Sequence, residues 1–263
     1  MSLFIAVGAE KLFEECLWQV FPLSSHFSKQ LSVLCLRGFT QLATNSLESI
    51  LRACPQLCHL DLSYCKRTAD STVALIGELY RDTMISLSLR SCHEITDDGI
   101  IAMCENFSGA HEHRKKFPSP ENDGQRYKEL NKIDLWSNLA YLNLGDIKNL
   151  SNRAMRTIAV NLMSSMIDLC VWGCFKLNND GVLELCMSHP ENKLRRINHC
   201  GCYKISDDSR LWFASSFKTS VINYIRVEEF GKDIDYSKRV ETPASVLHPF
   251  SDKSKDELHP LML

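Results

Sequence analysis

The sequence lacks an excess of either charge, a long apolar run and a glycine-rich phosphate loop. Its 30 Lys and Arg against 32 Asp and Glu give a formal net charge of -2, which does not favour DNA, RNA or an anionic membrane as the main ligand. No apolar run reaches the roughly 18 residues needed to span a bilayer. The chain also has no G-x-S-x-G or H-E-x-x-H motif, so we do not expect an enzyme.

Cysteine, in contrast, is abundant, with 12 residues in a chain of 263. In a secreted protein this number would indicate disulfides, and in a cytosolic protein it would indicate metal binding or simple burial. The apolar start of the chain has no basic residue ahead of it and runs directly into Glu10 and Lys11, so no signal peptide is predicted. We therefore expect a cytoplasmic protein with reduced thiols, with the nucleus as an additional location.

A repeat of about 27 residues organises most of the chain. The pattern apolar-x-x-apolar-x-apolar recurs, and successive starts differ by 26, 27, 55, 27, 28 and 28 residues. Thirteen residues after each of the first six starts stands a Thr, Asp or Asn, which we predict to be a helix N-cap. Each unit is thus predicted to form a short strand, a turn and a capped helix. The starts are Leu31, Leu57, Met84, Leu139, Met166, Leu194 and, in weaker form, Ile222.

One such unit cannot bury its apolar face alone, so neighbouring units are expected to stack into a solenoid. The predicted fold is α/β, with a curved parallel sheet on the concave face and helices on the convex face. The 55-residue interval equals two periods, but residues 108–124 offer no strand pattern. We predict six to seven repeats over residues 31–230, with an insertion at about residues 108–138.

The copy that begins at Met84 carries Cys92 eight residues later, followed by Ile95, Thr96 and Asp97. Across residues 31–230 the units resemble cysteine-containing leucine-rich repeats. That family includes substrate receptors of SCF-type (cullin–RING) ubiquitin ligases, in which the repeats select the protein to be ubiquitinated. The resemblance implies such a function, with a cullin adaptor as a further partner. The alternative is a non-ligase scaffold or inhibitor that binds a regulatory protein.

The two ends differ from the repeats. Residues 10–21 place apolar side chains along one helical face ahead of Pro22, so residues 1–30 are predicted to be an N-terminal helical cap on the first repeat. A remnant of an adaptor-binding F-box is the alternative for the same residues. Residues 231–263 are polar and punctuated by proline, which predicts a disordered tail.

Some cysteines have spacings that resemble zinc ligands, such as Cys54 with Cys58 and Cys170 with Cys174. The repeat register places the members of each pair on different parts of the unit, so their side chains are not expected to converge on one ion. No metal and no cofactor are therefore predicted. A small catalytic or metal protein that uses His199 and Cys200 is kept as an alternative.

Positions two, four and six after each start are expected to face the concave side, because alternation sends the leucines inward. Trp172 is the most prominent of these residues, since an exposed Trp at a regular repeat position has no packing role there. We predict that a protein partner binds this face, and the alternative is that the insertion or the tail covers Trp172. The predicted contact residues are Arg37, Asp61, Arg90, Tyr141, Asp168, Trp172, Arg196, Tyr224 and Arg226.

Overall fold

A computed structural model describes residues 2–5, 26–108, 138–187 and 193–206, all within the first of two compact units, Met1–Val227. In these residues seven strands form a single all-parallel sheet in chain order. The strands are β1 (Ser2–Ile5), β2 (Leu31–Cys35), β3 (His59–Asp61), β4 (Ser86–Ser88), β5 (Tyr141–Asn143), β6 (Asp168–Cys170) and β7 (Arg196–Asn198). The predicted α/β repeat solenoid, with a parallel sheet and one helix between successive strands of the repeats, is confirmed.

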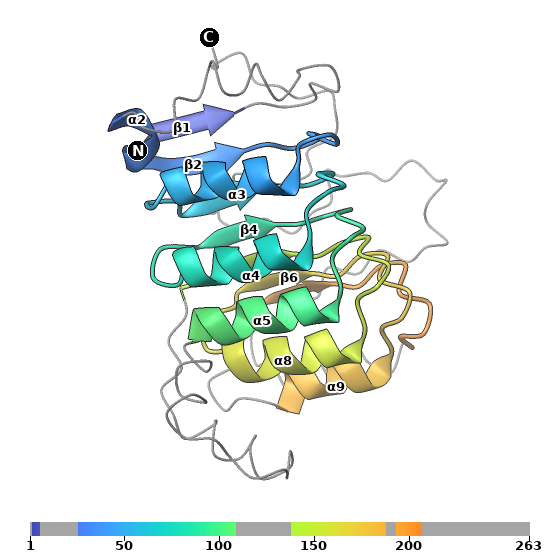
Figure 1. Cartoon of the computed structure of the whole chain (residues 1–263). Helices are drawn as coiled ribbons and strands as arrows, with labels where there is room; N and C mark the ends of the chain where they lie inside the picture. Colours follow the sequence, from blue (N-terminus) through green and yellow to red (C-terminus); the bar gives the residue numbers. More distant parts are fainter. Residues whose placement is uncertain (1, 6–25, 109–137, 188–192, 207–263) are drawn as a thin grey trace, which may run out of the picture. The chain divides into compact units, whose positions relative to one another are not determined.

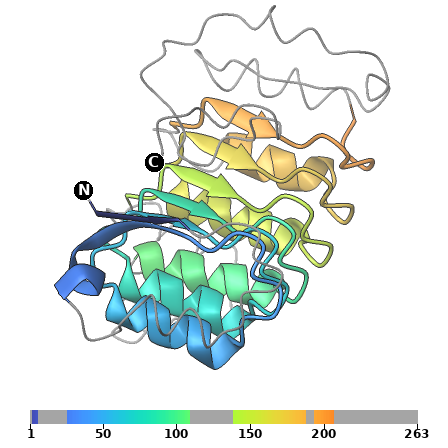
Figure 2. The same ribbon diagram turned by 90° about the horizontal axis from the view of Figure 1, so that it is seen from above.

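One helix follows each of the strands β2 to β6, and these helices form a layer on one side of the sheet (Figures 1 and 2). The sheet face on the opposite side is called the open face below. The helices are α3 (Thr44–Ala53), α4 (Asp70–Leu79), α5 (Asp97–Ser108), α8 (Asn152–Leu162) and α9 (Asn179–Met187), and a short helix, α2 (His26–Gln30), precedes β2. Within the described residues no helix is long and apolar enough to cross a membrane.

The strand register follows the sequence repeat. Leu60 pairs with Leu34 on one side and with Leu87 on the other, and Leu142 continues the same row. Strand β4 pairs directly with β5, which is the pairing that a single unit with a long insertion requires. Strand β1 was not predicted from the sequence: it lies within the expected N-terminal cap and pairs with β2. The helix expected at residues 10–21 and the tail at 231–263 lie outside the described residues.

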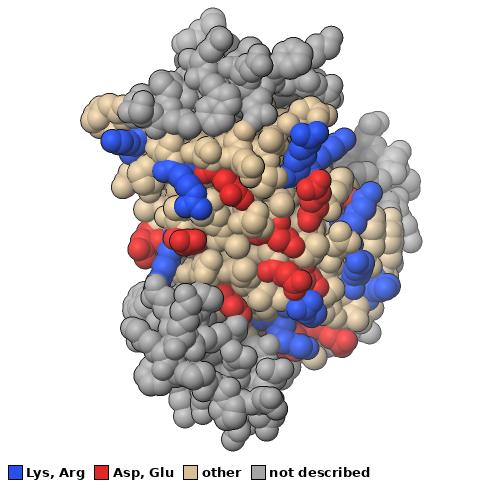
Figure 3. Space-filling view, in the orientation of Figure 1, with Lys and Arg blue, Asp and Glu red and all other residues tan. Residues whose placement is uncertain are grey.

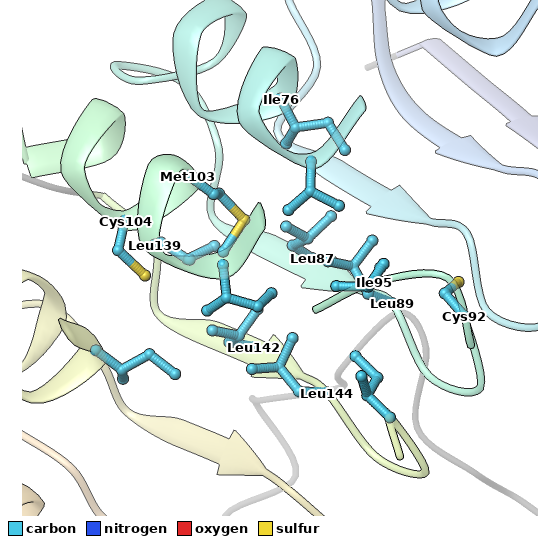
Figure 4. Packing of buried hydrophobic residues seen from close by; sticks show 14 of the residues in the cluster. Ile76, Leu87, Leu89, Cys92, Ile95, Met103, Cys104, Leu139, Leu142 and Leu144 are labelled. Atoms are coloured by element: carbon cyan, nitrogen blue, oxygen red, sulfur yellow. The ribbon is translucent and has the colours of Figure 1, made fainter. Parts of the chain in front are cut away.

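The core lies between the sheet and the helices. Leu87 of β4, Leu142 of β5 and Met103 of α5 belong to one buried cluster, and Leu89 and Leu144, which follow the two strands, continue it (Figure 4). All of these side chains are at most 2% exposed. Each repeat therefore buries its leucines against those of its neighbours, and this shared burial holds the repeats together.

The prediction of N-caps is wrong for α3, α4 and α8, in which the predicted residue is the first residue of the helix and the cap is the residue before it. Helices α3 and α4 begin at Thr44 and Asp70, and their caps are Ala43 and Ala69, which make no side-chain cap bond. Asp70 instead accepts hydrogen bonds from the backbone N–H and the hydroxyl of Thr96, in the next repeat, at 2.8 and 2.6 Å.

The same bond recurs along the solenoid. Asp97 accepts from the N–H of Ser151, Asn152 from that of Asn178, and Asn179 from that of Ser206. We call these bonds the inter-repeat ladder. In each of them the side chain accepts from a backbone N–H of the following repeat, and in the first three cases that N–H belongs to the residue just before the next helix. The polar column thus links repeats instead of capping its own helices.

Candidate functional site

Each of the strands β2 to β7 is followed by a left-handed turn at the seventh position after its repeat start. Glycine occupies this position in three repeats, Gly38, Gly173 and Gly201, with φ between 70° and 82°. Tyr64 occupies it in the second repeat with φ of 65°, a conformation that costs a non-glycine residue about 1 kcal/mol. Ser91 and Asp146 occupy the same position with φ of 57°, so the left-handed turn is shared by these repeats. Tyr64 differs from the other residues at this position in its large aromatic ring.

Tyr64 lies at the centre of a group of four side chains from four different repeats. The guanidinium carbon of Arg37 is 5.2 Å from the centre of the Tyr64 ring, and that of Arg90 is 5.6 Å from the same ring. Arg90 also lies 5.1 Å from the ring centre of Trp172. All four side chains are half-buried. We call Arg37, Tyr64, Arg90 and Trp172 the arginine–aromatic cluster, in which cation–π attraction joins each neighbouring pair.

Small residues between the large ones allow this arrangement. Arg37, Arg90 and Trp172 stand at the sixth position of their repeats, while Ser63 and Gly145 stand there in the repeats between them. Neighbouring parallel strands lie about 4.8 Å apart, and the repeat of β5, which carries Gly145 two residues after the strand, lies between those of Arg90 and Trp172. Because glycine has no side chain, the guanidinium and the indole can meet across it.

Two further predicted contact residues form an ion pair. Asp168 and Arg196 are register partners on β6 and β7, and their side chains are 2.6 Å apart. Burial raises the pKa of Asp168, and the neighbouring Arg196 opposes that shift. The pair therefore fixes both side chains on the open face near Tyr141, which is half-buried on β5.

The open face of β3 and β4 is buried and polar. Asp61 is 2% exposed and accepts a hydrogen bond from the N–H of Ser63, while the Ser63 and Ser88 hydroxyls lie 2.8 Å apart. The thiol of Cys35 is 3.8 Å from the other Asp61 carboxylate oxygen. Burial raises the pKa of Asp61. Asp61 is thus engaged within the protein and is less accessible to a partner than the arginine–aromatic cluster.

The structure brings Arg37, Arg90 and Trp172 together and places Asp168 with Arg196, while Tyr224 and Arg226 lie outside the described residues. The ring of Trp172 contacts the guanidinium of Arg90. Tyr64 was missed. Its signal in the sequence is the seventh column, where three glycines indicate a left-handed turn and one large aromatic residue stands out.

The recurring cysteines act as buried thiols. Cys65 donates to the Leu36 carbonyl at 3.0 Å, and Cys92, Cys174 and Cys202 each donate to the matching carbonyl of the preceding repeat. Burial raises the pKa of Cys92 to about 12, so this thiol stays protonated near neutral pH. The described cysteines are all free, and no group of three or more His, Cys, Asp or Glu among the described residues could hold a metal ion.

His199 and Cys200 follow β7. The ring of His199 is 6% exposed, while Cys200 is half-buried and its backbone N–H is bonded to the Asn198 side chain. Burial raises the pKa of the Cys200 thiol. A raised pKa disfavours the thiolate that nucleophilic catalysis needs.

No protein-family model matches the chain, and no curated protein sequence matches it. Solved structures do match. One is a chain of the yeast Rad7 and Elc1 complex, with 14% identity, a TM-score of 0.29, and coverage of 71% of this chain and 61% of that one. Another is the tropomodulin C-terminal domain of Caenorhabditis elegans, with 13% identity, a TM-score of 0.38, and coverage of 78% and 90%. The present chain thus spans less than two thirds of the yeast chain. Likeness at this level identifies neither a family nor a function.

Proposed function

We propose that this protein is a non-enzymatic binding module that holds a protein partner at the arginine–aromatic cluster. The observation that carries the proposal is the continuous contact of Arg37, Tyr64, Arg90 and Trp172 across the repeats. Arginine, tyrosine and tryptophan are the residue types that dominate binding energy at protein interfaces.

Pre-organisation adds to this support. The cation–π contacts hold each ring and guanidinium before a partner arrives, so less side-chain entropy is lost on binding. The left-handed turn places the Tyr64 ring against Arg37 and Arg90. Ser91 and Asp146 share this backbone conformation in the next two repeats but carry no ring.

The test is quantitative affinity purification from cells with the full chain, its Trp172→Ala variant and an Arg156→Ala control. Arg156 is exposed on α8 and pairs with Glu184 on α9, on the opposite side of the sheet from the cluster. We expect Trp172→Ala to weaken the partner's affinity by about 2 kcal/mol, with folding retained. Equal recovery of the same partners by all three proteins would show that the partner binds elsewhere.

We further propose that the bound protein is a substrate of an SCF-type ubiquitin ligase, which would place the chain in the cytoplasm or nucleus. The support is the resemblance of the repeat sequence, with its cysteine column and its Ile95-Thr96-Asp97 segment, to ligase substrate receptors. Co-purification of a cullin and its adaptor with the full chain tests this finer proposal. Recovery of the cluster-dependent partner without cullin or adaptor would instead favour the scaffold or inhibitor.

A further inference from the structure

A second surface lies on the edge formed by the turns between strands and helices. Phe175 and Tyr203, in neighbouring repeats, stack with ring centres 5.7 Å apart and planes at 5° to each other. They are 42% and 72% exposed. Large aromatic side chains that are this exposed are unusual in a folded protein and mark interaction sites when they gather with other features.

Lysines surround this stack. Lys148 occupies the position of Phe175 and Tyr203 in the preceding repeat, and Lys176 and Lys204 each follow one of the two rings. All three lysines are exposed, and none of them forms an ion pair with a described residue. We call Lys148, Phe175, Lys176, Tyr203 and Lys204 the turn patch. The sixth residue of these three turns is Asn149, which accepts a hydrogen bond from Lys176 at 3.2 Å.

The turn patch therefore combines three positive charges and two rings with no carboxylate among its six turn residues. The whole protein has a net charge of -2, so the positive charge of the turn patch is local and does not extend over the whole surface. In the space-filling view, Lys and Arg recur along the edge that carries the turns (Figure 3). Asp146, two residues before Lys148 in the sequence, accepts a hydrogen bond from the Ser91 hydroxyl.

We propose that the turn patch binds an acidic protein segment that carries an aromatic side chain. The lysines complement its carboxylates, and the outer face of the stacked pair accepts its ring, since offset stacking extends readily to a third ring. A single-stranded nucleic acid fits less well. Its bases could stack on the same ring face, but the chain, with a net charge of -2, lacks the broad positive charge that phosphate backbones require.

This surface differs from the arginine–aromatic cluster in residues and position, so the inference does not rest on the proposed function. The cluster lies at the sixth and seventh positions of the repeats, and the turn patch lies at the ninth and tenth. The equivalent turn of the second repeat carries Lys66 and Arg67, and that of the third carries His93 and Glu94, so neither has a Phe, Tyr or Trp. They provide a matched control.

The experiment measures fluorescence anisotropy of a labelled peptide that alternates glutamate and tyrosine, titrated with the full chain. We expect it to bind about tenfold more tightly than a peptide with glutamine for glutamate, and than one with alanine for tyrosine. Added salt should weaken the binding. Tighter binding of a labelled oligo(dT), equal binding of the three peptides, or no binding of the acidic peptide up to about 1 mM would overturn the proposal.

Variants then locate the site. Phe175→Ala with Tyr203→Ala, and separately Lys176→Ala with Lys204→Ala, should each weaken binding about tenfold. Because these side chains are exposed, both variants should keep the far-UV circular dichroism and melting temperature of the parent. Lys66→Ala with Arg67→Ala removes two positive charges from the ninth and tenth positions of the second repeat and should leave the affinity unchanged. A loss of affinity in this control equal to that in the turn-patch variants would contradict the assignment.

Discussion

Asp70→Ala should destabilise the solenoid by removing one rung of the inter-repeat ladder. The Asp70 carboxylate accepts two hydrogen bonds from Thr96, and a hydrogen bond to a charged group contributes about 1.5 to 3 kcal/mol. Both residues are half-buried, so water can replace part of the lost interaction. We therefore expect the free energy of unfolding to fall by about 2 to 3 kcal/mol.

Asp70→Asn is the matched control. Asparagine already serves at this position in two repeats: the Asn179 side-chain oxygen accepts from the Ser206 N–H at 2.8 Å, and its nitrogen donates to the Ser206 hydroxyl at 2.9 Å. An asparagine in place of Asp70 could make the same two bonds to the N–H and hydroxyl of Thr96. The expected loss is below about 1 kcal/mol, because only the charge is removed.

Urea unfolding monitored by circular dichroism at pH 7 measures both variants, with hydrogen exchange of the Thr96 amide as a local readout. The exchange of this amide should accelerate in Asp70→Ala and much less in Asp70→Asn. If Asp70→Ala unfolded within about 0.5 kcal/mol of the parent, or if the two variants lost equal stability, the ladder would not be what joins these repeats.

Three further outcomes are expected. Leu142→Asp should unfold the middle of the solenoid, because it places an unpaired charge at a site 2% exposed; Leu142→Met should cost less than about 1.5 kcal/mol, and equal melting of the two variants would mean that Leu142 is not a core residue. Gly181→Ala should lower the melting temperature, since its new methyl would lie 2.6 Å from the Asn152 side-chain oxygen; an unchanged value would show that the repeats can separate freely. Burial raises the pKa of Cys35 from 9.0 to about 11, and the negative charge of Asp61 adds to the shift. Because this folded pKa lies above the unfolded one, the stabilisation is complete below pH 9.0 and is lost as the pH rises through about 11, so the urea midpoint should fall across that range. A Cys35→Ala variant with the same pH profile would rule out a contribution of this thiol.

The fold could be predicted because its information is periodic. Leu34, Leu60, Leu87 and Leu142 share one position of the repeat, and the structure pairs them in that register. A one-residue slip would send these leucines to the open face, so the hydrophobic pattern alone specifies the pairing. Strand β1 escaped prediction because Ser2–Ile5 is a single short apolar segment without the rest of a repeat.

The polar details were harder to predict. Asp70 has the right residue type and position for a helix cap, and only the close approach of the next repeat makes Thr96 its partner. Gly99 and Gly181 were a usable signal: a side chain at either position would meet Asp70 or Asn152 of the preceding repeat. A glycine two residues after the polar position therefore indicates that the polar side chain of the preceding repeat lies against it.

The geometry of the candidate site does not follow from the repeat alone. The repeat register puts Arg37, Arg90 and Trp172 at one position of their units, while their ring contacts are seen only in the structure. The alternation of side chains along a strand predicts which face a residue is on, but not which neighbouring strand its side chain extends toward. The contact of Arg90 with Trp172 past Gly145 depends on that second property. Tyr64 lies in a turn, where the strand pattern no longer applies.

Site-specific photo-crosslinking tests the central claim, that a protein partner binds at the arginine–aromatic cluster, most directly. A photoreactive phenylalanine is placed at Tyr64 in one version of the full chain and at Arg156, on the helix side, in another. We expect irradiation in cells to yield a covalent adduct with a protein partner from position 64 and none with that partner from position 156. An adduct from position 156 alone, or no adduct from position 64 with partners that co-purify with the chain, would contradict the claim.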